Sequence, residues 1–258
     1  MSLHKKWVIG YFIAFIVMVA MNYAVGMSGA DVSDVANNNE AIIQPAGYAF
    51  SIWGLIYLLL LIWIINLFFS KKDKSLITER LTFWPILNFL LNGAWIIAFT
   101  QEWVLVSVLI IIAMLYTLAE MFTSLSATNV HWFDRLPFSI YFGWVTVATI
   151  VNIFTLAIAS NVDTILGMGE LTWTIIILIV ATLIGVVISL VFKDWAYPIT
   201  LIWPFVAIYV KSGDTYTSLD VTLTVASLVL LVVAVLVIIN KVRAPMTRTE
   251  SSQHAMKN

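Results

Sequence analysis

Three apolar stretches of the chain carry aromatic and amide side chains at intervals of three and four residues. Residues at these intervals share one face of a helix, so each set would form a single stripe. The stripes are Phe50, Trp53 and Tyr57, then Asn88, Asn92, Trp95 and Phe99, and finally Tyr141, Trp144, Ala148 and Asn152. Rings on one face can stack on a flat apolar ligand, and offset stacking contributes about 0.5 to 1.5 kcal/mol beyond area burial. The stripes therefore predict a pocket for a planar, hydrophobic molecule.

The side chains of these stripes have two interpretations. Lipid cannot satisfy an asparagine amide, so such a side chain should face protein or a cavity. For Asn92 and Asn152 we favour hydrogen bonds between helices, each contributing on the order of 1 kcal/mol. For Trp53, Trp95 and Trp144 we favour ligand contact over space filling, because each ring lies on a stripe that bears asparagine or tyrosine.

Few other residues of the chain could do chemistry. Cysteine is absent, which excludes disulfides, thiolate nucleophiles and cysteine-bound metals. His4, His131 and His254 fall in the termini and a short loop, so no buried imidazole is expected to ligate a metal. Glu120 is the one acid within an apolar stretch, where it could couple protons or pair with Arg135 or a lysine. We expect no catalytic residues, no metal and no required cofactor, in a protein that is not an enzyme.

The elements that position the stripes are membrane helices. With 62% hydrophobic and 10% charged residues, the chain is far more apolar than a soluble domain, in which about 25% of residues are charged. Apolar runs of about 20 residues can span a bilayer as helices. We predict eight such spans at residues 7–27, 48–69, 82–100, 103–124, 137–159, 172–192, 196–210 and 219–240. The predicted fold class is an all-α integral membrane protein with eight transmembrane helices.

The charge distribution predicts the orientation, because Lys and Arg collect on the cytoplasmic side of a membrane protein. With the N-terminus in the cytoplasm, only Lys211 of the 13 lysines and arginines falls outside. If one central helix were miscounted, the lysines and arginines would no longer gather on one side of the membrane. We expect both termini in the cytoplasm, and the basic inner loop with no transit peptide suits a bacterial plasma membrane.

Three segments have a second interpretation. The span 7–27 follows Lys5 and Lys6 and could be a cleaved signal peptide, but its apolar run is long for one, so we favour an anchor. The outer connection 28–47 is either a surface loop or a cover over the bundle opening. Pro204 should kink the short span 196–210. Such a kink either marks a transport site or belongs to a helix that only packs against its neighbours.

Taken in order, the stripes resemble the TspO/MBR family of tryptophan-rich sensory proteins and mitochondrial translocator (peripheral benzodiazepine receptor) proteins. The matching residues are Ile52, Trp53, Gly54 and Tyr57, then Leu91, Asn92, Trp95 and Phe99, and finally Tyr141, Trp144, Ala148 and Asn152. The resemblance covers about residues 1–160 and departs from the family at Ser51 and Ile140, where prolines are usual. It implies a TspO-like five-helix bundle over 1–160. Outside the resemblance, the apolar runs predict three additional helices over 161–241, and the charge pattern predicts a cytoplasmic tail over 242–258.

The resemblance also implies a pocket that opens toward the connection between the first two helices. Ligands of the family are tetrapyrroles such as protoporphyrin, sterols in the mitochondrial proteins, and synthetic isoquinolines or benzodiazepines. Carried over to this chain, Trp53 and Trp144 resemble the stacking rings, Asn92 and Trp95 the pocket wall, and Ala148 the small residue that leaves room for the ligand. A free-base porphyrin, the expected ligand, needs no metal ligand from the protein.

The expected function is that of a sensory or binding protein, a receptor for such a ligand. The expected ligand-binding residues are Phe50, Trp53, Tyr57, Asn92, Trp95, Phe99, Tyr141, Trp144, Ala148 and Asn152. The alternative is a secondary transporter of a small hydrophobic or amphipathic solute, which Pro204 and Glu120 would favour. The expected partners are the lipid bilayer and the hydrophobic ligand, a homodimer is left open, and nothing indicates nucleic acid.

Overall fold

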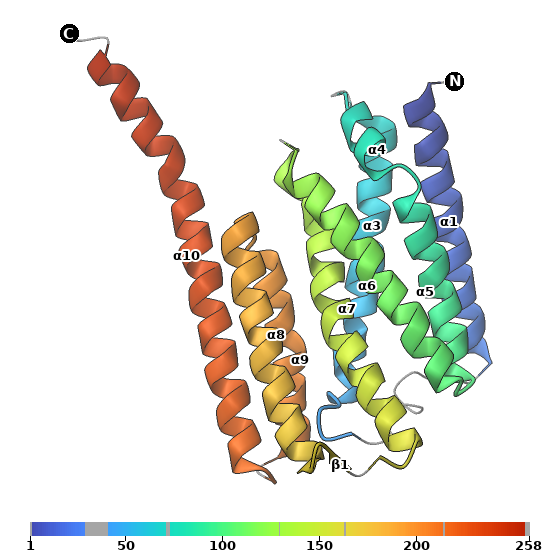
Figure 1. Ribbon diagram of the computed structural model, residues 1–258. Helices are drawn as coiled ribbons and strands as arrows, with labels where there is room; N and C mark the ends of the chain where they lie inside the picture. The colour runs from blue at the N-terminus through green and yellow to red at the C-terminus, as the bar shows by residue number, and fades with distance from the viewer. Residues whose placement is uncertain are drawn as a thin grey trace.

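The chain folds almost entirely into helices in the computed structural model (Figure 1). The structure describes residues 2–28, 41–70, 73–128, 130–162, 164–213 and 215–255, with side chains as far as Arg243. The elements are α1 (Leu3–Met27), η1 (Gly47–Ser51), α3 (Ile52–Phe69), α4 (Ser75–Leu81), α5 (Trp84–Thr100), α6 (Val104–Ser126), α7 (Trp132–Ala159), β1 (Thr164–Ile165), β2 (Met168–Gly169), α8 (Glu170–Phe192), α9 (Ala196–Ser212) and α10 (Thr217–Ala255). Most of the predicted connection 28–47 lies outside the described residues.

Six of these helices are long and apolar enough to cross a membrane, and the pair α4 and α5, bent by 58°, gives up to seven. The structure thus confirms a helical membrane protein, but by length and composition it supports fewer than the eight spans predicted. The predicted span 196–210 corresponds to α9, which has 17 residues, close to the lower limit for a crossing helix. The predicted span 82–100 is shorter as well, because the chain bends at Thr82, whose φ is 45°.

A short hairpin between α7 and α8 is the feature that the all-α prediction missed. Strands β1 and β2 pair antiparallel, with Ile165 opposite Met168. The turn between them, Leu166 and Gly167, has φ values of 53° and 75°. Two successive positive φ angles are typical of the tight hairpin turns in which glycine is favoured. Each strand is only two residues long, which is too short for a recognisable alternation of apolar and polar residues.

The helices form two groups that meet at α7 and α9. In the first group α1, α5, α6 and α7 pack as successive neighbours, and α3 packs against α1 and α7. In the second group α8, α9 and α10 pack on one another, and α9 contacts α7. Figure 1 places both chain termini at one end of the bundle and the hairpin at the other. We call these the terminal end and the hairpin end.

The two groups approach closely at Gly143 of α7. A Cβ atom added there would lie 2.9 Å from the Cβ of Thr200 and 3.2 Å from the carbonyl oxygen of Tyr197, both on α9. One turn further along α7, the Thr146 hydroxyl lies 2.9 Å from the Tyr197 hydroxyl. The two backbones can come this close because glycine has no side chain, so α7 and α9 pack directly against each other.

Of two ion pairs at the terminal end, Arg135–Asp194 joins the two groups, whereas Lys74–Asp134 ties the start of α4 to α7. Arg135 at the start of α7 lies 3.0 Å from Asp194, which precedes α9, and Lys74 lies 2.6 Å from Asp134. Asp194 is buried and also accepts hydrogen bonds from the Ser139 hydroxyl and the backbone amides of Ala196 and Tyr197. A buried carboxylate held in this way is stabilised by its cation and its donors together.

These pairs correct one expectation for Glu120. The sequence offered Arg135 as a partner for Glu120, but Arg135 is bonded to Asp194 instead. Glu120 interacts with the hydroxyl of Tyr116, one turn earlier on α6. Among the described residues, no lysine or arginine forms an ion pair with Glu120.

Candidate ligand-binding site

The aromatic residues predicted from the sequence come together near the hairpin end of the first helix group. Helix η1 supplies Phe50, α3 supplies Trp53, α5 supplies Trp95 and Phe99, and α7 supplies Trp144. We call these five residues the aromatic cluster. They come from segments far apart in the sequence, and in each segment helical spacing turns the rings to one side.

Trp53 lies at the centre of the aromatic cluster. Its ring centroid is 5.7 Å from that of Trp95 and 6.1 Å from that of Trp144. Phe50 meets Trp144 edge to face at 5.9 Å, and Phe99 stacks on Trp95 at 5.2 Å. All these separations fall within the range of about 4.5 to 7 Å in which aromatic pairs attract.

A polar layer lies beside the cluster and connects α1, α3, α5 and α7. The Asn92 amide nitrogen donates to the Tyr141 hydroxyl at 2.8 Å, and the Asn22 amide nitrogen donates to the Asn92 oxygen at 3.1 Å. The Tyr57 hydroxyl lies 3.0 Å from that Asn92 oxygen and 3.1 Å from the Asn22 oxygen, either of which can accept its proton. Asn92 therefore forms the predicted bonds between helices, and Tyr57 and Tyr141 are its partners.

A second polar group ties the cluster to α6. The Trp95 indole nitrogen donates to the Asn152 side-chain oxygen at 3.0 Å, and the Asn152 amide nitrogen donates to the Ser107 hydroxyl at 3.0 Å. The predicted bonding of Asn152 between helices is thus confirmed. Asn88 faces away from the cluster, because its amide nitrogen donates to the Thr117 hydroxyl on α6 at 2.7 Å.

The cavity at the cluster is nearly closed, with a volume of about 20 Å³. Its lining residues are Pro45, Phe50, Trp53, Trp95, Phe99, Trp144, Val147, Ala148, Val151 and Asn152. Three predicted site residues, Tyr57, Asn92 and Tyr141, lie in the polar layer and do not line it. A cavity of this size holds about one water molecule, whereas ligand pockets span roughly 300 to 1,000 Å³. The rings therefore occupy the space that a planar ligand would need.

Two indole groups of the cluster lack a hydrogen-bond partner among the residues that the structure describes. The Nε1 atoms of Trp53 and Trp144 are both buried, and no described residue accepts a hydrogen bond from either. Trp144 as a whole is only 1% exposed. A buried donor left unpaired costs about 1 to 3 kcal/mol. These N–H groups are thus available to an acceptor atom that enters the cavity.

Helix α9 holds the segment 45–50, whose Pro45 and Phe50 line the cavity; we call this segment the mouth of the cavity. The Trp203 indole nitrogen donates to the carbonyl oxygen of Ala49 in η1 at 3.0 Å, and the Ala46 backbone amide donates to the Ala207 carbonyl at 3.1 Å. Tyr48 packs edge to face on Trp203 at 5.5 Å. We call these contacts the α9 clamp. They place a helix of the second group against the segment that carries Pro45 and Phe50.

The sequence stripes missed several residues of this site. Asn22, Ser107 and Trp203 each lie within an apolar run without a striped pattern around them. A single asparagine in the first predicted span was a usable signal for Asn22, because such an amide needs a protein partner. Pro45, Val147 and Val151 carry no chemistry that distinguishes them in the sequence, and only the fold brings them to the cavity.

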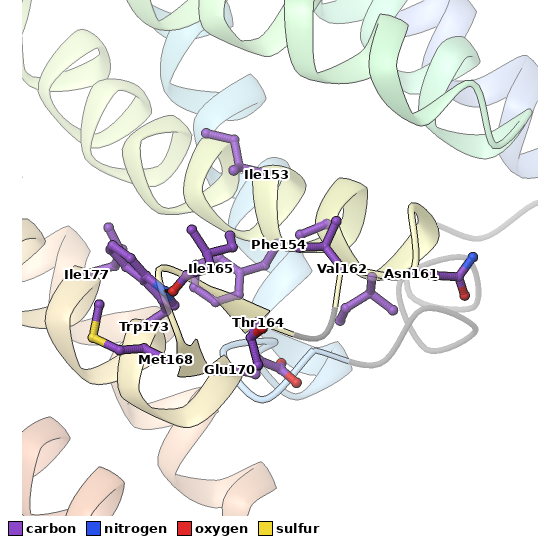
Figure 2. Close-up of a pocket in the computed structure, with 12 residues that line it drawn as sticks. Ile153, Phe154, Asn161, Val162, Thr164, Ile165, Met168, Glu170, Trp173 and Ile177 are labelled. Atoms are coloured by element: carbon purple, nitrogen blue, oxygen red, sulfur yellow. Dashed lines mark hydrogen bonds between the residues drawn. The ribbon is translucent and has the colours of Figure 1, made fainter.

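A larger cavity lies elsewhere, at the hairpin end between α7, the hairpin and α8. It is a groove of about 620 Å³, shown in Figure 2. Its lining includes Phe154 and Ile158 of α7, Ile165 of the hairpin, and Trp173 and Ile177 of α8. None of the predicted ligand-binding residues contributes to it. Within the described part of the chain, no group of three histidine or acidic side chains could hold a metal ion in either place.

The fold and the site together define a helical membrane protein whose aromatic cluster lies within the first group of helices, with α9 of the second group packed against η1. The family model for TSPO-like proteins matches residues 6–239, so the chain belongs to the TSPO-like family. The match continues through α8, α9 and most of α10, and the expectation that the likeness ends near residue 160 is wrong. No curated protein and no solved structure matches the chain.

Proposed function

We propose that the protein is a membrane sensory and binding protein that holds a planar hydrophobic ligand, a tetrapyrrole such as protoporphyrin, in the aromatic cluster. The proposal rests on the indole N–H groups of Trp53 and Trp144, which have no hydrogen-bond partner in the described part of the chain. A tetrapyrrole offers a flat ring for stacking and carboxylate oxygens that accept hydrogen bonds. It would therefore use both the rings and the unpaired donors.

Binding requires the cluster to open. The present cavity is too small for a macrocycle, so the rings of Trp53 and Trp144 must separate by a rotamer or helix movement. Their edge-to-face contact would be exchanged for contacts with the ligand, which limits the net cost. The movable segment is η1, a single five-residue 3₁₀ turn that leads into α3.

The proposal includes the orientation in the membrane. With both termini in the cytoplasm, the hairpin end and the mouth of the cavity face outward. Eight crossings would leave both termini at one end, as they lie in Figure 1, and α5 and α9, with 17 residues each, would be the shortest of them. A bacterial plasma membrane is the location that the charge pattern favours.

The experiment is a titration of the purified protein in lipid nanodiscs with protoporphyrin, followed by the Soret absorbance of the porphyrin. We expect one saturable site. Ala148→Trp should fill the cavity and abolish binding, whereas Ala113→Trp on α6, which does not line the cavity, should bind as the wild type does. Unsaturable uptake equal to that of empty nanodiscs would contradict the proposal.

A transporter is the second candidate function, and the α9 clamp favours it. A short helix with Pro204 inside it contacts the mouth of the cavity, and proline-interrupted helices occur at transport sites. Proton-dependent porphyrin flux into liposomes, reduced by Glu120→Gln, would establish transport. Binding without any flux would leave the sensory function as the only candidate.

A further inference from the structure

The groove at the hairpin end has the size and shape of a separate binding site. Its volume of about 620 Å³ falls within the range of small-molecule pockets, roughly 300 to 1,000 Å³. The hairpin forms one side of it, and the Trp173 indole nitrogen fixes the hairpin by donating to the Ile165 carbonyl at 2.9 Å. The hydrogen bond from Trp173 therefore holds the hairpin in place as one wall of the groove.

The lining of the groove is amphipathic along its length. At the loop side lie Glu170, Thr164 and Asn161, while Ile153 and Ile177 lie two turns further into α7 and α8 (Figure 2). Glu170 and Ile177 are seven residues apart, which corresponds to roughly 10 Å along a helix. A molecule in the groove would thus place a polar head near Glu170 and an apolar chain toward the bundle.

Glu170 gives the loop side of the groove, where the polar head would lie, a negative charge. It is the one charged residue among the described lining residues. One carboxylate oxygen accepts from the Ile42 backbone amide, and no described donor contacts the other oxygen. The N-terminus of α8 opposes this charge with about half a positive unit, which leaves a net negative end. Charge complementarity therefore favours a cation.

The ring of Trp173 suits the same ligand. It borders the groove one turn from Glu170, as Figure 2 shows, and its indole N–H is already used by the hairpin. The face of a tryptophan attracts quaternary ammonium groups, and the attraction strengthens where water is excluded. A carboxylate and an indole on one side of a head group are the chemistry that recognises alkylammonium ions.

We propose that this groove binds a free single-chain amphiphile with an ammonium head, placed with its head between Glu170 and Trp173 and its chain along Phe154 and Ile177. The site is distinct from the aromatic cluster and does not depend on the function proposed for that cluster. Its cavity, its charge and its aromatic face come from residues that none of the three sequence stripes includes.

The test is equilibrium binding of radiolabelled decyltrimethylammonium to the full-length protein in nanodiscs of digalactosyldiacylglycerol, an uncharged lipid without an ammonium group. We expect saturable binding above that of empty nanodiscs. Glu170→Gln keeps an oxygen for the Ile42 amide but removes the charge, and should weaken binding about tenfold. Glu102→Gln, an exposed acid between α5 and α6 at the same end, should leave it unchanged.

A groove-filling variant, a competing anion and a change of lipid test the proposal further. Ala157→Trp, which fills the groove from α7, should abolish binding, and decyl sulfate should not compete. In phosphatidylcholine nanodiscs saturable binding should persist, and its loss would assign the groove to lipid head groups and overturn the proposal. Equal affinity of the Glu170→Gln variant, competition by decyl sulfate, or binding by the Ala157→Trp variant would each overturn it as well.

Discussion

The Trp203 indole nitrogen of α9 donates a 3.0 Å hydrogen bond to the carbonyl oxygen of Ala49 in η1, although the two residues are 154 positions apart. The bond joins the second helix group to the mouth of the aromatic cluster. The family model matches residues 6–239, a range that includes α9. Access to the cluster should therefore depend on α9.

Removing this bond should accelerate exchange of ligand. Trp203→Phe deletes the donor but keeps a ring against Tyr48. A single hydrogen bond contributes about 0.5 to 1.5 kcal/mol, so we expect porphyrin association and dissociation to be about two- to tenfold faster. Stopped-flow absorbance measures both rates. Trp103→Phe, an exposed ring between α5 and α6, is the matched control, and equal rates in the two variants would count against the clamp.

Locking the clamp should block the cavity. The chain contains no cysteine, so the double variant Ala46→Cys, Ala207→Cys introduces the sole thiol pair, at positions whose backbones are hydrogen bonded. Oxidation to the disulfide should prevent porphyrin binding, and reduction should restore it. The measurement is the binding isotherm before and after reduction, with each single variant as control. Full binding by the oxidised double variant would show that η1 need not leave α9.

The polar layer should contribute to stability independently of any ligand. Asn92→Ala removes the donor to the Tyr141 hydroxyl and one of the two acceptors of the Asn22 amide nitrogen, and we expect a loss of about 1 to 3 kcal/mol. Asn66→Ala on the exposed face of α3 is the matched control and should change stability by less than about 0.5 kcal/mol. Reversible unfolding in mixed micelles gives both values. Equal losses in the two variants would mean that the layer adds nothing.

Removing one partner of the Arg135–Asp194 ion pair should lower the stability of the protein more than removing both partners. Arg135→Met leaves the buried Asp194 carboxylate without its cation, and we expect a loss of about 3 to 5 kcal/mol. Adding Asp194→Asn keeps an oxygen for the α9 amides and should recover part of that loss. A double-mutant cycle measures the coupling. Strict additivity of the two substitutions would show that the pair is not coupled.

The sequence predicted the helices of this fold well, because long apolar runs leave few alternatives in a membrane protein. It placed Trp53, Trp95 and Trp144 on faces that meet, since helical spacing alone determines which side chains share a face. The number of spans is harder to predict from the sequence than the positions of the helices, because α9 is short and a bend at Thr82 separates α4 from α5.

What the sequence could not predict depends on contacts between distant segments. The clamp formed by Trp203 and the partner of Arg135 join residues that no local pattern relates. The groove at Glu170 exists because a hairpin too short for a strand signal stands beside α8. The closed state of the aromatic cluster likewise follows from side-chain packing, which spacing does not determine.

The most direct test of the central claim compares porphyrin binding by two double variants. Trp53→Ala with Trp144→Ala removes the stacking rings and the unpaired donors, whereas Trp103→Ala with Trp132→Ala removes two exposed tryptophans. Both proteins are titrated in nanodiscs by Soret absorbance. The account predicts that the first variant binds at least about tenfold more weakly than wild type and the second binds normally. Undiminished binding by the first variant would contradict the assignment of the aromatic cluster as the ligand site.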